Sequence, residues 1–460
     1  MKMHFCGDRP PARVSFGSCP TGSMAQKRIG SVLVLTVLLS GLVVAQEPPT
    51  PWRDDALFQR ISAALDPVLA IDTHTHLLGS GKFDPARAAQ APLMNRATHP
   101  WFPSVIKARF DVTVDTADWA PGVDAIATAR AAMIKRLGQH GYWTDHLDYT
   151  RTEIALVNMN SRQGIDDKRL RWVPQASTLL YPLPADHLMA RSPSHRDGIG
   201  GAQKDLHGFL TSGGLTTIPA DLDAYVRFID DTLRRWQKQG AVAVKFYDAY
   251  LRTLRIADVP EAEAADLYAK GRTTALARDE YLALQDFLWR HILLEAGEIT
   301  LPAHIHSSLG VPPFLRSSES DVRNLEDVLA DPRFFATPIV LIHGGGPWHE
   351  IAIYLAFKPN VWVDISSIGF LAPVPDFADI LRKYLLFAPE KVLYGTDAAN
   401  YPSVPGGADV QHVMLSRANR DALYLALAGL VRDGVIDHAR AVEIGRGVLR
   451  DNARRLYGWK

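Results

Sequence analysis

The sequence predicts an α/β fold, a (β/α)₈ barrel of the TIM type with long loops after its first and third strands. Eight short apolar runs, most of them rich in Val, Ile or Leu, follow one another along the chain, as buried parallel strands do. Helical patterns separate the runs. Polar side chains gather where the runs end, and barrels build their active sites at that end. An open doubly wound sheet stays open as an alternative, because periodicity alone does not separate the two.

The expected strands span residues 68–74, 153–159, 169–176, 241–247, 300–306, 338–345, 361–366 and 391–397. The expected helices include 221–239, 279–297 and 322–330. The first of these helices opens at Asp221 and stops at Gly240, which suit its two caps. Segments 77–150 and 182–220 exceed the needs of a minimal barrel. Both follow strands, so we expect them to form a lid or a substrate wall at the active-site face.

Residues 1–45 have features of a leader and a signal peptide rather than of the barrel. Residues 1–23 form a leader of doubtful translation, and residues 24–45 have the order of a signal peptide, with Lys27 and Arg28 before an apolar run. Residues 46–67 are a tether and a first helix, and 68–460 form a single barrel domain. We expect cleavage and a periplasmic or secreted protein without stable membrane insertion. A retained membrane anchor is the alternative, although the run is short for a span.

Composition limits the classes of function. Lys plus Arg and Asp plus Glu number 50 each, which predicts no nucleic-acid partner. Both cysteines, Cys6 and Cys19, lie in the doubtful leader, so we expect no disulfide or thiolate chemistry in the mature chain. A small-molecule substrate is expected, and a homo-oligomer is left open.

The stretch "IDTHTH" raises a specific question about His74 and His76. Alternate residues of a strand share one face, so these two imidazoles would converge. They could share a ligand, or they could simply be exposed on an edge strand.

Further polar residues stand on the later strands: Lys245 on the fourth, His304 and His306 on the fifth, His343 after the sixth and Asp397 after the eighth. Any single histidine of this kind more often serves packing than ligation. Histidines and a carboxylate at several strand ends together form a ligand set suited to a divalent metal such as zinc. Such a metal with an open position acidifies a bound water.

Several stretches resemble the amidohydrolase superfamily, in the branch of FluG-like proteins and relatives of aminocarboxymuconate-semialdehyde decarboxylase. They are "IDTHTH", "AVKFYDAY", "LPAHIH", "VLIHGGGPWHEIAIYLAFKPNVWVDIS", "KVLYGTDA" and "NARRLYGW". The resemblance implies a barrel with a metal, most simply Zn²⁺, held by His74, His76, His306 and Asp397. It also implies that His343 is a second-metal ligand or a substrate-activating group.

Three positions complicate this transfer. His304 stands where relatives carry glutamine, and it is a candidate for substrate contact or for supporting a ligand. Tyr250 and Arg252 are candidate substrate contacts, although Leu251 occupies the position where relatives carry arginine. Lys245 is either a carbamate bridging two metal ions or a point charge beside Asp397; we favour one ion, with two left open.

Two further side chains have competing interpretations. Asp397 would act as general base and then general acid, whereas its alternative is a carboxylate that caps a turn. Trp348 would wall the substrate pocket, or belong to the core.

Together these features predict an exported metal-dependent hydrolase that cleaves an amide, ester or lactone bond with a metal-activated water. The first alternative is a metal-dependent decarboxylase of a small unsaturated or aromatic acid. The second is a non-catalytic exported binding protein on a barrel scaffold, which should lack part of the metal set.

Overall fold

A computed structural model describes residues 50–79, 101–115, 120–307, 315–400 and 406–460, all within one compact unit, Glu47–Lys460. The leader 1–23 and the expected signal peptide 24–45 lie outside the described residues. Within the described ranges, every helix is too short or too polar to cross a bilayer.

The described residues include eight strands, paired in parallel. They are β1 (Ala70–Thr75), β2 (Thr152–Asn158), β3 (Leu170–Val173), β4 (Val244–Phe246), β5 (Ala303–His306), β6 (Ile339–Ile342), β7 (Val361–Asp364) and β8 (Val392–Leu393). Each overlaps one of the eight runs expected from the sequence.

The strands close into a ring. Hydrogen bonds join β1, β2 and β3 in one sheet and β4 to β8 in another. Parallel bridges between Trp172 and Ala241 and between Gln175 and Lys245 connect the two sheets on one side. On the other side, the Asp397 amide donates to the His74 carbonyl at 2.7 Å and the Thr73 amide to the Tyr394 carbonyl at 2.9 Å. The barrel prediction is confirmed, and the open-sheet alternative is wrong.

The barrel interior has an apolar layer and a polar layer. Ile71, Leu156, Val340 and Leu393 belong to one buried apolar cluster inside the barrel. The short C-terminal helix α18 (Asn452–Tyr457) supplies Ala453, Leu456 and Tyr457 to the same cluster. Arg454 of this helix bonds Glu153 at the start of β2, and Arg455 bonds the Glu390 carbonyl before β8, so the helix closes the amino-terminal end and the polar side chains are left at the carboxyl end.

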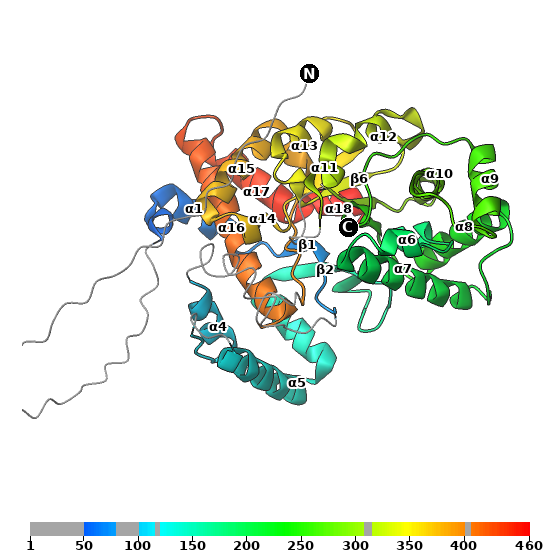
Figure 1. Ribbon diagram of the computed structural model, residues 1–460. Coiled ribbons are helices and arrows are strands. Elements are labelled where there is room, and N and C mark those ends of the chain that lie inside the picture. The colour runs from blue at the N-terminus through cyan, green and yellow to red at the C-terminus, as the bar shows by residue number, and fades with distance from the viewer. Residues whose placement is uncertain (1–49, 80–100, 116–119, 308–314, 401–405) are drawn as a thin grey trace, which may run out of the picture. The chain divides into compact units, whose positions relative to one another are not determined.

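Helices surround the strands (Figure 1). Their bounds are α1 (Ala56–Leu65), α4 (Phe102–Phe110), α5 (Ala120–Tyr149), α6 (Asp186–Met189), α7 (Pro193–Ser212), α8 (Leu222–Lys238), α9 (Glu261–Gly271), α10 (Arg278–Glu298), α11 (Ser317–Ser320), α12 (Glu326–Ala330), α13 (His349–Leu355), α14 (Ile368–Leu371), α15 (Val374–Phe387), α16 (Ala408–Arg432) and α17 (His438–Arg446). The predicted helix 221–239 is α8, capped by the Asp221 carboxylate, which accepts from the Ala224 amide. The predicted helix 279–297 is α10, whereas 322–330 is a 3₁₀ turn followed by α12.

The two long insertions contain more helix than expected. Segment 77–150 holds α4 and the long α5, which kinks at Gly138, and residues 80–100 and 116–119 of it lie outside the described part. Segment 182–220 holds the 20-residue helix α7. Ser192 caps α7, Pro193 begins it, and Ile199 and Leu206 lie on its buried face. The cap, the proline and the apolar face favour a helix more than the glycines of this segment disfavour one. One of these glycines, Gly198, leaves room for the Leu251 side chain.

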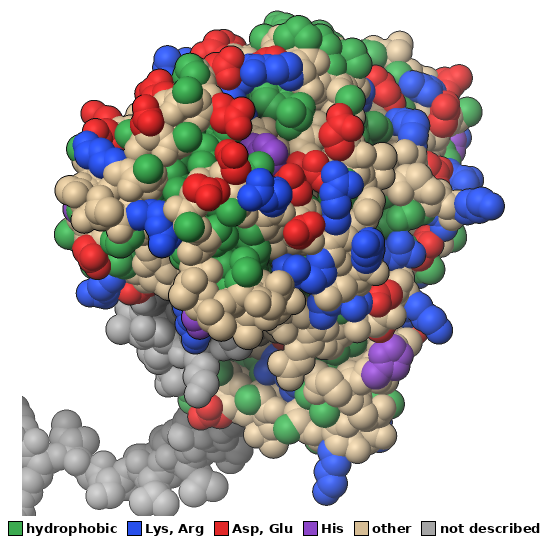
Figure 2. Space-filling model, turned by 90° about the vertical axis from the view of Figure 1, so that its right-hand side faces the viewer, with side chains coloured by type: hydrophobic (Ala, Val, Ile, Leu, Met, Phe, Trp, Pro, Cys, Tyr) green, Lys and Arg blue, Asp and Glu red, His purple; other side chains and the backbone are tan. Residues whose placement is uncertain are grey.

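Surface charge is mixed on the face shown in Figure 2, where Lys and Arg side chains lie among Asp and Glu side chains. This agrees with the equal numbers of acidic and basic residues in the sequence.

Candidate metal centre

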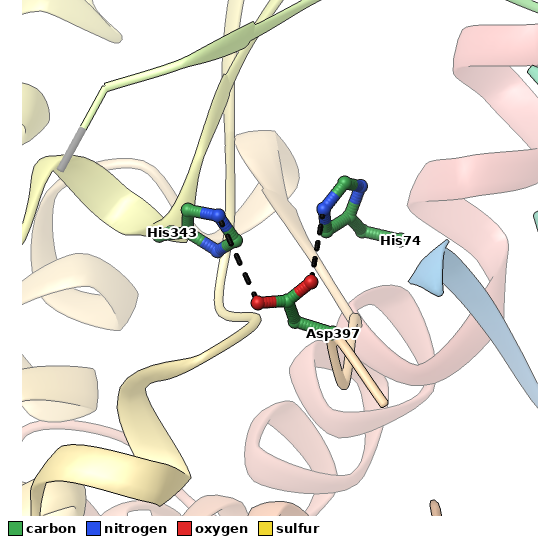
Figure 3. A group of neighbouring side chains, drawn as sticks. All are labelled: His74, His343 and Asp397. Carbon is green, nitrogen blue, oxygen red and sulfur yellow. Dashed lines mark ion pairs between the residues drawn. The ribbon is translucent and has the colours of Figure 1, made fainter. Parts of the chain in front are cut away.

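Three side chains meet at the carboxyl end of the barrel. His74 belongs to β1, His343 follows β6 and Asp397 follows β8. One potential ligand atom of each lies within 4.8 Å of the others, and all three residues are buried. Figure 3 shows both imidazoles pointing toward the Asp397 carboxylate from two sides. His74 Nε2 lies 3.2 Å from Asp397 Oδ1, and His343 Nε2 lies 4.0 Å from Oδ2.

His76 lies beside this group. Its Nε2 atom is 3.5 Å from Asp397 Oδ1, and its ring centroid is 5.2 Å from that of His74. A register irregularity between Asp72 and Thr75 marks a bulge in β1, and bulges commonly re-aim side chains near active sites. The edge-strand interpretation of these histidines is wrong, because β1 bonds to β2 on one side and to the chain after β8 on the other.

His306 contacts His343. Its Nδ1 atom lies 3.1 Å from His343 Nε2, and the Tyr250 ring lies 4.4 Å from its imidazole, centroid to centroid. The structure groups His343 with His74 and Asp397. The sequence had instead predicted His76 and His306 as the ligands that join those two residues. Ligation by His76 and by His306, and substrate contact by Tyr250, stay predictions.

Hydrogen bonds fix the orientation of the two central imidazoles. Asn158 Nδ2 lies 3.0 Å from His74 Nδ1; binding of a cation at Nε2 requires the hydrogen on Nδ1, with the amide oxygen of Asn158 as its acceptor. Ser366 Oγ lies 2.8 Å from His343 Nδ1 and donates to Asp364 Oδ1 at 2.7 Å. With both Nδ1 atoms engaged, each ring presents Nε2 to Asp397. Partners of this kind set the ring orientation of metal-binding histidines.

The Asp397 carboxylate has its own partner. Ser367 Oγ donates to Asp397 Oδ2 at 2.6 Å, so Oδ1 is the oxygen that faces His74 and His76. His343, Ser367 and Asp397 all have positive φ, at 69°, 62° and 61°. Left-handed backbone at residues other than glycine is costly and is concentrated at functional sites.

Burial keeps the imidazoles neutral. It lowers the pKa of His74 and of His343 well below the usual range, and the nearby Lys245 ammonium adds to the effect for both. Neutral imidazole is the form that binds a metal ion. The donor set, two neutral imidazoles and one carboxylate on rigid strand ends, therefore fits a divalent cation such as zinc.

Lys245 lies next to His74 inside the barrel. Its Nζ atom is 3.4 Å from His74 Nε2, and burial lowers its pKa to about 8 against the opposing charges of Asp397 and Asp364. Burial raises the pKa of Asp364 to about 7, although bonds from the His343 amide and from Ser366 oppose the rise. The position suits either a carbamate or a charge partner of Asp397, and both roles stay predictions.

Three predicted substrate contacts are placed elsewhere. His304 pairs in register with Lys245 on the inward face, but its Nε2 lies 2.7 Å from the Tyr457 hydroxyl of the closing helix α18. Arg252 is buried in an ion pair with Asp286. Trp348 precedes α13 and packs, half-buried, against the core. These environments argue against substrate contact by His304 and Arg252, and they favour the core interpretation of Trp348.

Five supporting residues escaped the sequence interpretation: Asp72, Asn158, Asp364, Ser366 and Ser367. Only their positions could have indicated them, because the second and seventh strands also end in polar residues. Asn and Ser are so common in turns that their type alone does not distinguish them.

Comparison with known proteins identifies the family. The amidohydrolase family model matches residues 217–459, which is more than half of the 460 residues. No curated protein matches the chain.

Three solved structures share the fold. A Lactobacillus casei ATCC 334 protein, provisionally described as a metal-dependent hydrolase, is 17% identical and has a TM-score of 0.58, covering 86% of this chain and 97% of its own. Uronate isomerase from Thermotoga maritima is 14% identical, with a TM-score of 0.57 and coverage of 87% and 97%. Glucuronate isomerase from Caulobacter crescentus is 12% identical, with a TM-score of 0.57 and coverage of 89% and 95%. The family match and the metal-binding geometry together show that this chain belongs to the amidohydrolase family of metal-dependent enzymes.

Proposed function

We propose that this chain is an exported metal-dependent hydrolase that cleaves an amide, ester or lactone bond of a small organic substrate. The observation that carries the proposal is the buried group of His74, His343 and Asp397 at the carboxyl end of the barrel. A divalent cation held there, Zn²⁺ in the simplest case, would supply Lewis acidity to water and to a substrate carbonyl.

The protein's own groups would handle the proton. In hydrolysis, water forms a bond to the carbonyl carbon, and the bond from that carbon to nitrogen or oxygen breaks. Asp397 Oδ1 faces the two imidazoles while Ser367 holds Oδ2. This carboxylate can take the proton from water and deliver it to the leaving group, as general base and then general acid. His74 and His343, being neutral, would bind the cation without adding charge to the site.

Product analysis on the metal-loaded protein tests the reaction. The panel would include aryl esters, anilides, lactones, aromatic carboxylic acids and a uronate, because two structures with this fold are isomerases. Appearance of an acid with an alcohol or amine supports hydrolysis. Carbon dioxide or an isomerised sugar acid would replace the proposal with decarboxylation or isomerisation.

A matched pair of variants separates chemistry from folding. Asp397→Asn removes the carboxylate of the site, and turnover should fall by about 10²–10⁴-fold, the range for a lost acid–base group. Asp376→Asn makes the same change at an exposed position of α15 and should leave turnover unchanged. Equal turnover in both variants would remove Asp397 from the mechanism.

Export is a separate part of the proposal and is supported by the order of charged, apolar and small residues in 24–45. Mass spectrometry of the N-terminus of the native protein tests it. We expect a start near residue 46, and a retained peptide from residues 1–45 would contradict export with cleavage.

A further inference from the structure

We infer that His146 and His412 position the Asp72 carboxylate, and that this buried chain lets the insertion helix α5 set the geometry of the metal centre. The inference rests on the proposed metal site but not on the reaction carried out there. It concerns three titratable side chains, all fully buried, that the mechanism itself does not use.

Asp72 ties the two ligand-bearing strand ends together. Its Oδ1 accepts from the amides of His74 at 3.2 Å and Thr396 at 3.0 Å. Its Oδ2 accepts from Thr396 Oγ1 at 2.6 Å. One donor is the His74 amide itself and the others come from the residue before Asp397, so a shift of this carboxylate would move both ligands.

His412 of α16 fixes the remaining lone pair of that carboxylate. Its Nε2 lies 3.2 Å from Asp72 Oδ2, and its Nδ1 lies 3.0 Å from Nε2 of His146. An ionised carboxylate only accepts, so Nε2 of His412 must carry hydrogen. His146 Nδ1 is buried with no partner among the described residues, and a lone pair is less costly there than an N–H, so the hydrogen of His146 lies on Nε2 and is donated to Nδ1 of His412. The chain of hydrogen bonds therefore runs in one direction, from His146 through His412 to Asp72.

His146 brings the insertion helix into this chain. It lies in the last turn of α5, on a helix that is fastened to α16 by two more contacts. Arg130 donates to both carboxylate oxygens of Asp409, with Nε 2.5 Å from Oδ2 and Nη2 2.6 Å from Oδ1, and the Tyr142 hydroxyl bonds the same carboxylate. Docking of α5 therefore presents the His146 donor to His412.

Loss of that donor has a definite consequence. Without His146, the Nδ1 lone pair of His412 stays buried with no donor, and the ring keeps only its bond to Asp72. The His412 imidazole then loses one of its two anchors, and the Asp72 carboxylate is held less firmly. Residues that orient metal ligands in this way typically change metal affinity by about 10–100-fold when removed.

Two substitutions at one position test the inference. His146→Leu removes the donor, whereas His146→Gln keeps an amide N–H able to reach Nδ1 of His412. We expect the affinity for Zn²⁺, measured by chelator competition, to fall by about 10–100-fold in His146→Leu and to stay within about threefold in His146→Gln. His140→Gln, on the exposed surface of the same helix, is the control and should bind Zn²⁺ as the wild type does.

Nitrogen NMR of histidine-labelled protein gives a readout that packing alone would not move. His412 should show hydrogen on Nε2 in the wild type and in both variants, with an Nδ1 signal typical of a hydrogen-bonded lone pair in the wild type and His146→Gln and of a free lone pair in His146→Leu. Hydrogen on Nδ1 of His412 in the wild type would overturn the inference, and it needs no variant to fold. Unchanged Zn²⁺ affinity in a folded His146→Leu would also overturn it. Failure of the wild type to bind Zn²⁺ would instead contradict the proposed function, while the tautomer remains measurable.

Discussion

At His74, the Asn158 amide lies 3.0 Å from Nδ1, and at His343 the Ser366 hydroxyl lies 2.8 Å from the equivalent atom. These partners turn both Nε2 atoms toward Asp397. At the scale of single residues, the site therefore depends on side chains that would never touch a metal or a substrate.

Asn158→Leu should weaken metal binding while preserving the fold. The substitution keeps a side chain of similar size but removes the amide that orients His74. We expect the dissociation constant for Zn²⁺, from competition with a chelator, to rise by about 10–100-fold. Asn324→Ala removes an amide that bonds only surface carbonyls and should not change it. Equal affinity for the two variants would show that His74 needs no such support.

The sequence indicated the candidate ligands but not the residues that support them. His74, His343 and Asp397 were identifiable because imidazoles and a carboxylate at successive strand ends serve few packing needs. Asn158 and Ser366 were not, since such residues follow strands in most turns. The ion pair of Arg252 with Asp286 was not predictable, because Asp286 lies on a helix whose contact with the loop no local pattern indicates.

At the scale of elements, α5 and α18 each contact the barrel through specific polar atoms. The kink of α5 at Gly138 has φ 73° and ψ 163°, a conformation open essentially to glycine alone. Its last turn carries His146 toward α16. The sequence indicated an insertion here but not the helix direction, which depends on long-range contacts with Asp409 and His412.

Gly138→Ala and Gly141→Ala should have opposite effects on stability. An added Cβ at Gly138 meets no atom, so the whole cost is backbone strain, about 1–3 kcal/mol. Gly141 lies three residues away, its backbone is not in the left-handed region and its Cβ has room, so alanine there should stabilise by about 0.5–1 kcal/mol. Urea midpoints of the two variants measure the difference. Equal destabilisation by both would contradict the kink.

Tyr457→Phe should destabilise the closing helix α18. The change leaves His304 Nε2 without its hydroxyl partner in the barrel interior, at a cost of about 1–3 kcal/mol. Tyr354→Phe deletes a hydroxyl from a side chain that is 64% exposed and should be neutral. The free energy of unfolding in urea distinguishes them, and a neutral Tyr457→Phe would show that the His304 contact adds nothing to stability.

At the scale of the whole molecule, the barrel was predictable because eight apolar runs in one chain specify eight parallel strands. Its closure depends on bonds between β1 and the chain just after β8, about 320 residues apart in the sequence, and no local pattern indicates these. The folded chain also buries several histidines, and burial favours the neutral form of their imidazoles.

The folded protein should lose stability in mild acid. Burial lowers the pKa of His74, His146, His304 and His343, whereas the unfolded chain titrates near 6.5. Between the folded and unfolded pKa values the unfolded state binds more protons, so stability decreases as pH falls below about 6.5, by about 1.4 kcal/mol per pH unit for each histidine. Urea unfolding of metal-free protein from about pH 8 to about pH 5 measures this. A flat or rising profile would contradict neutral burial.

The most direct test of the metal centre is elemental analysis of protein purified without chelators, with Asp397→Asn and Asp376→Asn beside the wild type. We predict about one zinc-like ion per chain in the wild type and in Asp376→Asn, and a clear loss in Asp397→Asn. About two ions per chain would assign Lys245 the bridging role. No metal in the wild type, with none taken up on adding zinc or manganese, would contradict the account.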